Sequence, residues 1–212
     1  HLDQFGLAVT ATDWRGNNNI AESIISQLAA EPHPDPAWIV CGVGTGGTSA
    51  TIGRYLRYRG LATRLCAAEP TGSAFVHAWR ERARDARCSR PTLIEGIGRP
   101  QVEPGWVFET VDEVIEVPDA ASIAAMQVLK DHLGKRYGGS SGTNLVACLQ
   151  LACRMREEGL RGSIVSLLCD PGERYDQTLY DRQWLARNGI DPAPAADALR
   201  RTIATGRWRP LC

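Results

Sequence analysis

The chain has 212 residues, with 24 basic and 24 acidic side chains and therefore no formal net charge. This balance argues against nucleic acid or an anionic membrane as the main partner. No apolar run reaches the roughly 20 residues of a membrane-spanning helix, and the 7 cysteines show neither a C-x-x-C pair nor metal-site spacing. We therefore expect a cytoplasmic protein without a metal, a membrane span or a disulfide framework.

Short apolar runs alternate with segments of helical period, a pattern typical of βαβ units. Helices are predicted at 19–30, 48–59, 74–85, 119–133, 145–157 and 175–187. Strands are predicted at 38–41, 63–68, 114–117 and 163–169. From residue 191 onward the pattern fades. The sequence thus predicts an α/β fold with an open, mostly parallel sheet over residues 1–187, followed by a Pro/Ala-rich, mobile tail over 188–212.

A glycine-rich turn, GVGTGGT at 42–48, separates a predicted buried strand from a predicted helix. Glycine reaches positive φ angles and lets the backbone approach a ligand closely. The free N–H groups at the start of the helix, with its dipole, favour an anion such as phosphate. Thr45 and Thr48 add two hydroxyl donors. The alternative is a tight turn that binds nothing, but such a turn needs fewer glycines and threonines.

The same turn satisfies a second pattern. Gly42, Gly44 and Gly47 match G-x-G-x-x-G, the pattern of dinucleotide-binding sites. Glu69 follows at the end of the next predicted strand, where such sites place an acidic residue for the ribose. A nicotinamide-dependent oxidoreductase, NAD(P)-linked, therefore stays open at this point.

Further segments carry a specific resemblance. In order, the chain contains DQF (3–5), GTGGT (44–48), GIG (96–98), SSG (140–142) and GERY (172–175). In these landmarks it resembles the cysteine synthase and cystathionine β-synthase family, whose members are pyridoxal 5'-phosphate (PLP) enzymes of fold type II. The resemblance covers residues 1 to about 187. A Rossmann dehydrogenase does not account for GIG, SSG or GERY.

The resemblance implies a role for each segment. The PLP phosphate would be held by Gly44, Thr45, Gly46, Gly47 and Thr48. The substrate would lie beside the loop formed by Gly96, Ile97 and Gly98. Arg99, which follows this loop, is expected in solvent or against a substrate carboxylate.

The turn after the last strand is implied to face the pyridine nitrogen. The family usually offers a serine there, and in this chain Asp170 or Pro171 takes its place. A carboxylate from Asp170 would keep the nitrogen protonated and strengthen the ring as an electron sink. The alternative is that Asp170 only caps the following helix.

GIGRPQVEP, GGSSGTN and LLCDPGERY most resemble the L-cysteine desulfhydrases, which release sulfide, pyruvate and ammonia from cysteine. The implied reaction is β-elimination or β-replacement on cysteine or an activated serine. Cysteine synthesis from O-acetylserine is the alternative within the same chemistry.

The Schiff-base lysine of the family lies in an S-x-K segment upstream of DQF, and this chain begins at His1. We therefore expect a fragment, a processed product or a sequence that begins partway along a longer chain. Lys130 and Lys135 are expected in solvent, so the chain should contain no catalytic residue and be inactive alone. A homodimer, paired with the missing N-terminal segment, is the expected assembly, and a non-catalytic partner subunit is a further alternative.

Overall fold

The computed structural model describes residues 3–8, 10, 13–15 and 19–211. His1, from which we expected a fragment or a processed product, lies outside these residues. Within them, four strands form one sheet in the order β3-β2-β1-β4, and every pairing between neighbours is parallel. The strands are β1 (Trp38–Cys41), β2 (Arg64–Pro70), β3 (Glu113–Val117) and β4 (Ile164–Ser166). The predicted α/β fold with a parallel sheet is confirmed.

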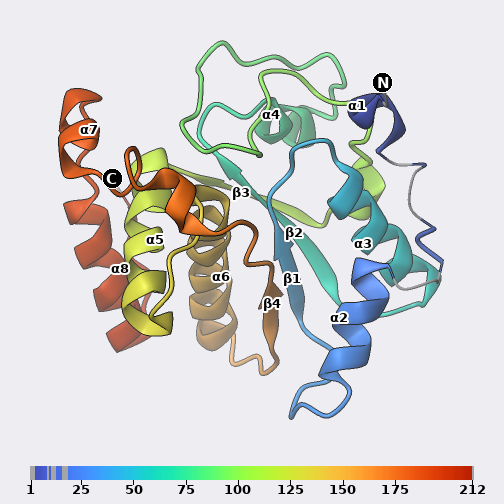
Figure 1. Ribbon diagram of the computed structural model, residues 1–212. Helices are drawn as coiled ribbons and strands as arrows, with labels where there is room; N and C mark the ends of the chain where they lie inside the picture. Colours follow the sequence, from blue (N-terminus) through green and yellow to red (C-terminus); the bar gives the residue numbers. More distant parts are fainter. Residues whose placement is uncertain (1–2, 9, 11–12, 16–18, 212) are drawn as a thin grey trace.

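Helices cover both faces of this sheet (Figure 1). They are α1 (Gln4–Leu7), α2 (Ile20–Leu28), α3 (Gly47–Tyr58), α4 (Ala74–Glu81), α5 (Asp119–Leu133), α6 (Gly139–Glu157), α7 (Arg182–Arg187) and α8 (Ala193–Thr205), with the 3-10 turns η1 (Phe108–Thr110) and η2 (Gly172–Tyr175). Helices α2 and α3 lie on one face, and α5, α6 and α8 lie on the other. None of the helices in the described ranges is long and apolar enough to cross a membrane.

Neighbouring residues of the central strands face opposite layers. Val40 and Ala68 pack into the core shared with α5, α6 and α8, whereas Ile39 and Ala67 pack into the core shared with α3 and α4. All residues of β1 are buried. A parallel sheet covered on both faces needs such continuous apolar strands, which is why β1 was recognisable in the sequence.

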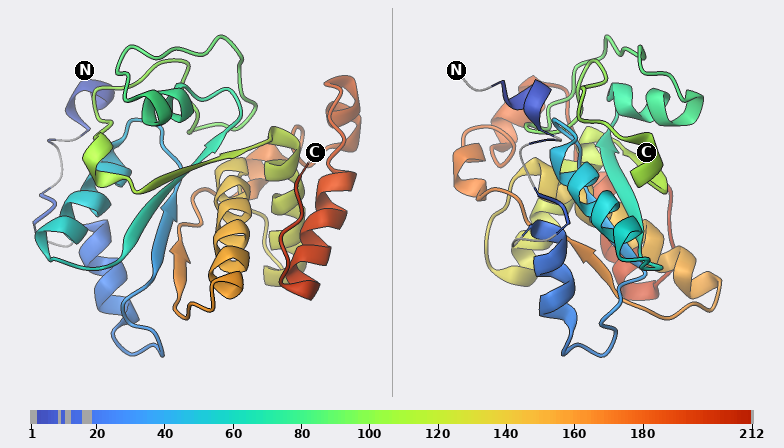
Figure 2. Two further views of the ribbon diagram at one scale, coloured as in Figure 1. Left: turned by 180° about the vertical axis from the view of Figure 1, so that it is seen from behind. Right: turned by 90° about the vertical axis from the view of Figure 1, so that its right-hand side faces the viewer.

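The segment predicted as a Pro/Ala-rich, mobile tail contains α8, a helix that the sequence pattern did not predict. Gly206 ends the helix in the left-handed conformation, with φ 64°. Ala195, Ala196 and Leu199 are buried in the core formed with α5 and α6, and α8 runs beside α5 in Figure 2. The sequence signal was weak because the buried face consists largely of alanines, which favour helix but look unremarkable in a hydropathy pattern.

The order of the strands creates a gap between two loops. After β1 the chain proceeds outward through β2 and β3, and then returns by α5 and α6 to place β4 on the other side of β1. The loops that leave β1 and β4 therefore diverge to opposite faces. In open α/β sheets, ligands bind at such a switch point, beyond the carboxyl ends of the strands.

Candidate functional site

A cavity of about 500 Å³ lies at the carboxyl ends of β1 and β4. Its walls come from the glycine turn, the GIG loop, the first turns of α6 and the segment that follows β4, and Gln4 of α1 also reaches it. Of the predicted site residues, those that line the cavity are Gly44, Thr45, Gly46, Thr48, Gly96, Ile97 and Asp170. Gly47 and Gly98 lie behind this wall, each adjacent to a residue that forms it.

The glycine turn has a backbone that only glycine permits. Gly46 has φ 88° and forms the N-cap of α3, where no side chain accepts a hydrogen bond from the helix. A Cβ on Gly46 would come within 3.0 Å of Gly105, and one on Gly44 within 3.0 Å of the Gly96 carbonyl oxygen. The Gly47 N–H donates to the Thr45 hydroxyl oxygen at 3.3 Å, and the N-cap residue itself has no side chain to accept from the N–H groups that follow, which is the local geometry of an anion site.

The GIG loop packs directly on this turn. The Gly98 N–H donates to the Val43 carbonyl oxygen at 3.2 Å. A Cβ on Gly42 would meet the Ile97 side chain at 2.7 Å, so the absence of a side chain lets the two loops touch. The structure therefore brings together two segments that the sequence separates by two helices, a strand and a long loop.

Glu69 lies beneath both loops, with none of its surface exposed. Its Oε1 accepts from the Val43 N–H and its Oε2 from the Ser73 hydroxyl, each at 2.6 Å. Burial raises the pKa of Glu69 to about 8, and hydrogen bonds from Ser73, Val43 and Gly98 oppose this rise. The side chain does not line the cavity, so the interpretation of Glu69 as a ribose-binding residue is wrong.

Asp170 lies on the opposite wall. Its Oδ2 accepts from the Tyr175 hydroxyl at 2.6 Å, and its side chain is 29% exposed. The N-cap of η2 is Pro171, and no side chain caps that turn. Burial, followed by the hydrogen bond to Asp170, raises the pKa of Tyr175. The interpretation of Asp170 as a helix cap is therefore wrong, because its carboxylate is held by Tyr175 instead.

Sequence reasoning missed Ser140 and Asn144 as cavity residues. Helix α6 begins at Gly139 and not at residue 145, so these two side chains lie one helical turn apart on one face, and both line the cavity. Asn144 is 1% exposed, and its Nδ2 donates to the Leu167 carbonyl at 3.2 Å. Its Oδ1 is buried without a hydrogen-bond partner among the described residues. The signal in the sequence was the four-residue spacing of Ser140 and Asn144 within GGSSGTN, which places two side chains on one face of a helix.

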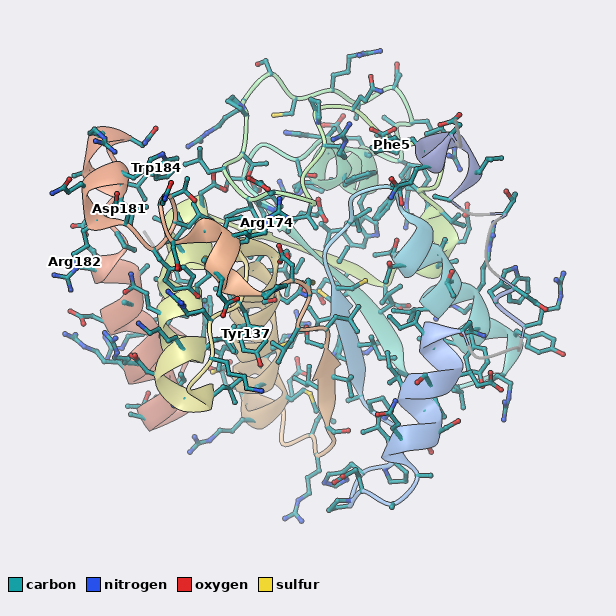
Figure 3. The ribbon with its side chains drawn as sticks, viewed as in Figure 1. Phe5, Tyr137, Arg174, Asp181, Arg182 and Trp184 are labelled. Carbon is teal, nitrogen blue, oxygen red and sulfur yellow. The ribbon has the colours of Figure 1, made fainter. Side chains whose placement is uncertain are left out.

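Three basic residues considered in the sequence analysis do not line the cavity. Arg99 donates to buried Glu103 at 3.0 Å and stacks on the Phe5 ring with its guanidinium carbon 4.8 Å from the centroid. Its side chain is 39% exposed and does not line the cavity. Figure 3 shows Phe5 and Arg174 on two sides of this end of the sheet. Lys130 and Lys135 are exposed, as expected, and Lys130 borders a separate groove formed by α5, α7 and α8. No group of metal-ligating side chains occurs in the described part of the chain.

Comparisons with known proteins agree with this geometry. The family model described as "Pyridoxal-phosphate dependent enzyme" matches residues 1–170. The chain is 52% identical over 208 residues to L-cysteine desulfhydrase Cds1 of Mycobacterium tuberculosis (strain ATCC 25177 / H37Ra), covering 98% of this chain and 56% of that protein. It is 34% identical over 165 residues to cysteine synthase 2 of Schizosaccharomyces pombe (strain 972 / ATCC 24843), covering 72% of this chain and 41% of that protein.

A solved structure is similar in fold. It is the crystal structure of a mutant of a hydrogen sulfide-producing enzyme, complexed with an alpha-aminoacrylate intermediate. The TM-score is 0.65 with 26% sequence identity, over 77% of this chain and 46% of that one. The chain thus spans about half the length of the relatives that it matches.

Proposed function

Because the chain belongs to the family of pyridoxal-phosphate dependent enzymes, we propose that the complete enzyme acts on cysteine by β-elimination and releases sulfide. The observation that carries this proposal is the 52% identity to an L-cysteine desulfhydrase over 98% of the chain. The cavity with its glycine cradle supports it, because β-elimination of this kind requires a bound electron sink.

The cavity is suited to PLP in size and in chemistry. Its volume of about 500 Å³ falls in the usual range of small-molecule sites. The glycine turn presents helix N–H groups where side chains would otherwise intrude, which suits a phosphate. The unpartnered Oδ1 of Asn144 is a buried acceptor on the cavity wall, and a buried acceptor without a donor is costly unless a ligand or water supplies one.

Each wall then has a role in binding. Gly44 to Thr48 would hold the phosphate through backbone N–H groups and hydroxyls, and the loop from Gly96 to Gly98 would border the amino-acid substrate. Asp170 remains the proposed group for the pyridine nitrogen, oriented by the Tyr175 hydroxyl, with Ser140 as a second polar group on the same side. Bound PLP would supply a sink for the negative charge left when the α-proton of the substrate is removed.

The base that removes that proton is proposed to come from outside this chain. Both local lysines are exposed, and neither lines the cavity. We therefore propose that the working protein pairs this chain with a lysine-bearing segment, as a homodimer in the cytoplasm. Cysteine synthesis from O-acetylserine is the second candidate, favoured by the identity to a cysteine synthase. A non-catalytic partner subunit is a third, favoured by the exposed lysines.

Complementation tests the proposal. Sulfide release from L-cysteine would be measured on this chain with PLP, alone and mixed with the part of the Mycobacterium relative that the chain does not match. We expect no sulfide from the chain alone and sulfide from the mixture. Cysteine formation from O-acetylserine and sulfide, without desulfhydration, would favour the second candidate. A mixture that binds PLP and turns over neither substrate would favour the non-catalytic subunit.

A further inference from the structure

Glu69 is a buried carboxyl group that the proposed reaction does not use. It is the last residue but one of β2, before Pro70, has no exposed surface and does not line the cavity. A polar group in such a place is costly unless its oxygens are satisfied by hydrogen bonds. Its partners therefore indicate why the position is occupied by an acid.

Those partners belong to two different segments. The Val43 N–H comes from the turn that begins the anion cradle, and the Ser73 hydroxyl comes from the N-cap of α4. Both segments are in turn bonded to the chain around the GIG loop, because the Gly98 N–H donates to the Val43 carbonyl at 3.2 Å and the Ala74 N–H donates to the Arg99 carbonyl at 2.8 Å. One side chain thus connects the phosphate side of the cavity to the substrate side.

We propose that Glu69 is a positioning residue that sets the spacing between the anion-binding turn at 42–48 and the loop at 96–98. Its meaning for catalysis rests on the proposed function, but the coupling itself is a property of this chain. The two loops otherwise touch through glycines, as at Gly44 against Gly96, where backbone meets backbone and no side chain can adjust the fit. Glu69 lies beneath this contact and holds Val43 and Ser73, the first of which is bonded to Gly98.

A carboxyl group suits this role better than an apolar side chain. Leucine would leave the Val43 N–H buried without an acceptor. Glutamine keeps one acceptor oxygen for the Val43 N–H, but its NH2 group then faces Ser73, whose oxygen already accepts from the Phe75 N–H at 3.3 Å. The variant Glu69→Gln should therefore fold and retain part of the coupling.

Asp112, just before β3, provides a matched control because it binds the other end of β2. Its Oδ2 accepts from the Leu65 N–H at 2.7 Å, and its Oδ1 accepts from Arg57 at 2.7 Å. Asp112→Asn thus also weakens a carboxylate-to-backbone hydrogen bond of β2, but far from the cavity. A general loss of stability would appear in both variants, whereas a loss of loop coupling should appear only at Glu69.

The test follows backbone amide resonances by NMR while inorganic phosphate is added to wild type, Glu69→Gln, Glu69→Leu and Asp112→Asn. In wild type and Asp112→Asn, phosphate should shift the amides of both 44–48 and 96–98. In Glu69→Gln the affinity should fall about 10-fold, as for loss of about one hydrogen bond, and the shifts at 96–98 should shrink. Equal affinity and equal shifts in Glu69→Gln and Asp112→Asn would overturn the inference, whether or not Glu69→Leu folds.

Amide hydrogen exchange separates this inference from the proposed function. If wild type binds no phosphate, the proposed function loses its support, and exchange decides about Glu69 alone. The amides of Val43 and Gly98 should then exchange faster in Glu69→Gln than in Asp112→Asn. The two variants are compared at the same interval below their melting temperatures, so that global stability does not account for the difference. Unchanged protection of both amides would contradict a positioning role.

Discussion

Arg174 and Glu95 form an ion pair across the solvent side of the cavity, with 3.1 Å between Arg174 Nη2 and Glu95 Oε2. Arg174 belongs to the turn after β4, and Glu95 precedes the GIG loop, so the pair joins opposite walls. Both side chains are 61% exposed. An ion pair this exposed is screened by solvent and contributes little to stability.

Arg174→Ala should therefore leave the fold intact. We expect the free energy of unfolding in urea to change by less than about 1 kcal/mol. Glu95→Ala should have an equally small effect, since neither group becomes buried when its partner is lost. A loss of several kcal/mol in either variant would show that the pair is part of the structural core rather than a feature of the cavity entrance.

Gly46→Ala should be far more damaging than Gly60→Ala. Both glycines have positive φ, 88° and 63°, so both substitutions strain the backbone by about 1–2 kcal/mol. Only at Gly46 would the new Cβ also collide with backbone, at Gly105, whereas Gly60 has nothing within 4 Å. Thermal denaturation should rank the variants, and phosphate binding should be lost at Gly46 alone. Equal melting temperatures would contradict the observed close approach.

Tyr175→Phe should destabilise the protein through Asp170. The phenol hydroxyl donates to the carboxylate at 2.6 Å, and a hydrogen bond to a charged group is worth about 1.5–3 kcal/mol. A double-mutant cycle with Asp170→Ala should show coupling of this order, and Tyr58→Phe, at a 60% exposed tyrosine, is the control without effect. Strictly additive effects would mean that the two groups do not interact in solution.

Stability should fall as the pH rises toward 8 because of Glu69. The folded protein keeps a proton on this carboxyl up to about pH 8, whereas in the unfolded chain it is lost near the ordinary value of 4.5. The stabilisation is fully present below 4.5 and is lost through this window, by at most about 1.4 kcal/mol per pH unit.

Other groups near Glu69 should not mask this slope. Cys41 stays neutral because burial raises its pKa to about 12, and Glu116, in register on β3, is paired with Arg80. Urea denaturation between pH 5 and about 8 should therefore show a shallower slope for Glu69→Gln than for wild type. The same slope in both would assign the pH dependence to other groups.

Borohydride reduction in the presence of one equivalent of PLP per chain should leave both lysines without a pyridoxyl label. Lys130 and Lys135 are exposed and do not line the cavity, so a cofactor held by the glycine turn cannot reach them. Peptide mapping by mass spectrometry is the measurement. A pyridoxyl label on either lysine, competed by inorganic phosphate, would place that lysine at the site and contradict the structure.

Several parts of the fold and the site were readable from local sequence. The apolar run WIVC predicted the buried strand β1, and the glycines after it predicted a turn with positive φ angles, so β1 and the cradle could be read from the sequence. The roles of Glu69 and Asp170 were not, because each depends on a partner distant in the fold or on burial, such as Val43 or Tyr175. Ser140 and Asn144 were hidden because glycine and serine at the start of α6 read as a turn.

The position of β4 has a consequence for how the chain folds. The Ser166 hydroxyl donates to the Val40 carbonyl across 126 residues of sequence, because the strand beside β1 is the last one made. Pairing strands so distant in sequence incurs the entropy of closing a long loop before their contacts form, which slows folding. During synthesis, the glycine turn therefore exists long before the wall that contains Asp170. The ligand cavity should be among the last features to form, and until then one edge of β1 is open to pairing with other chains.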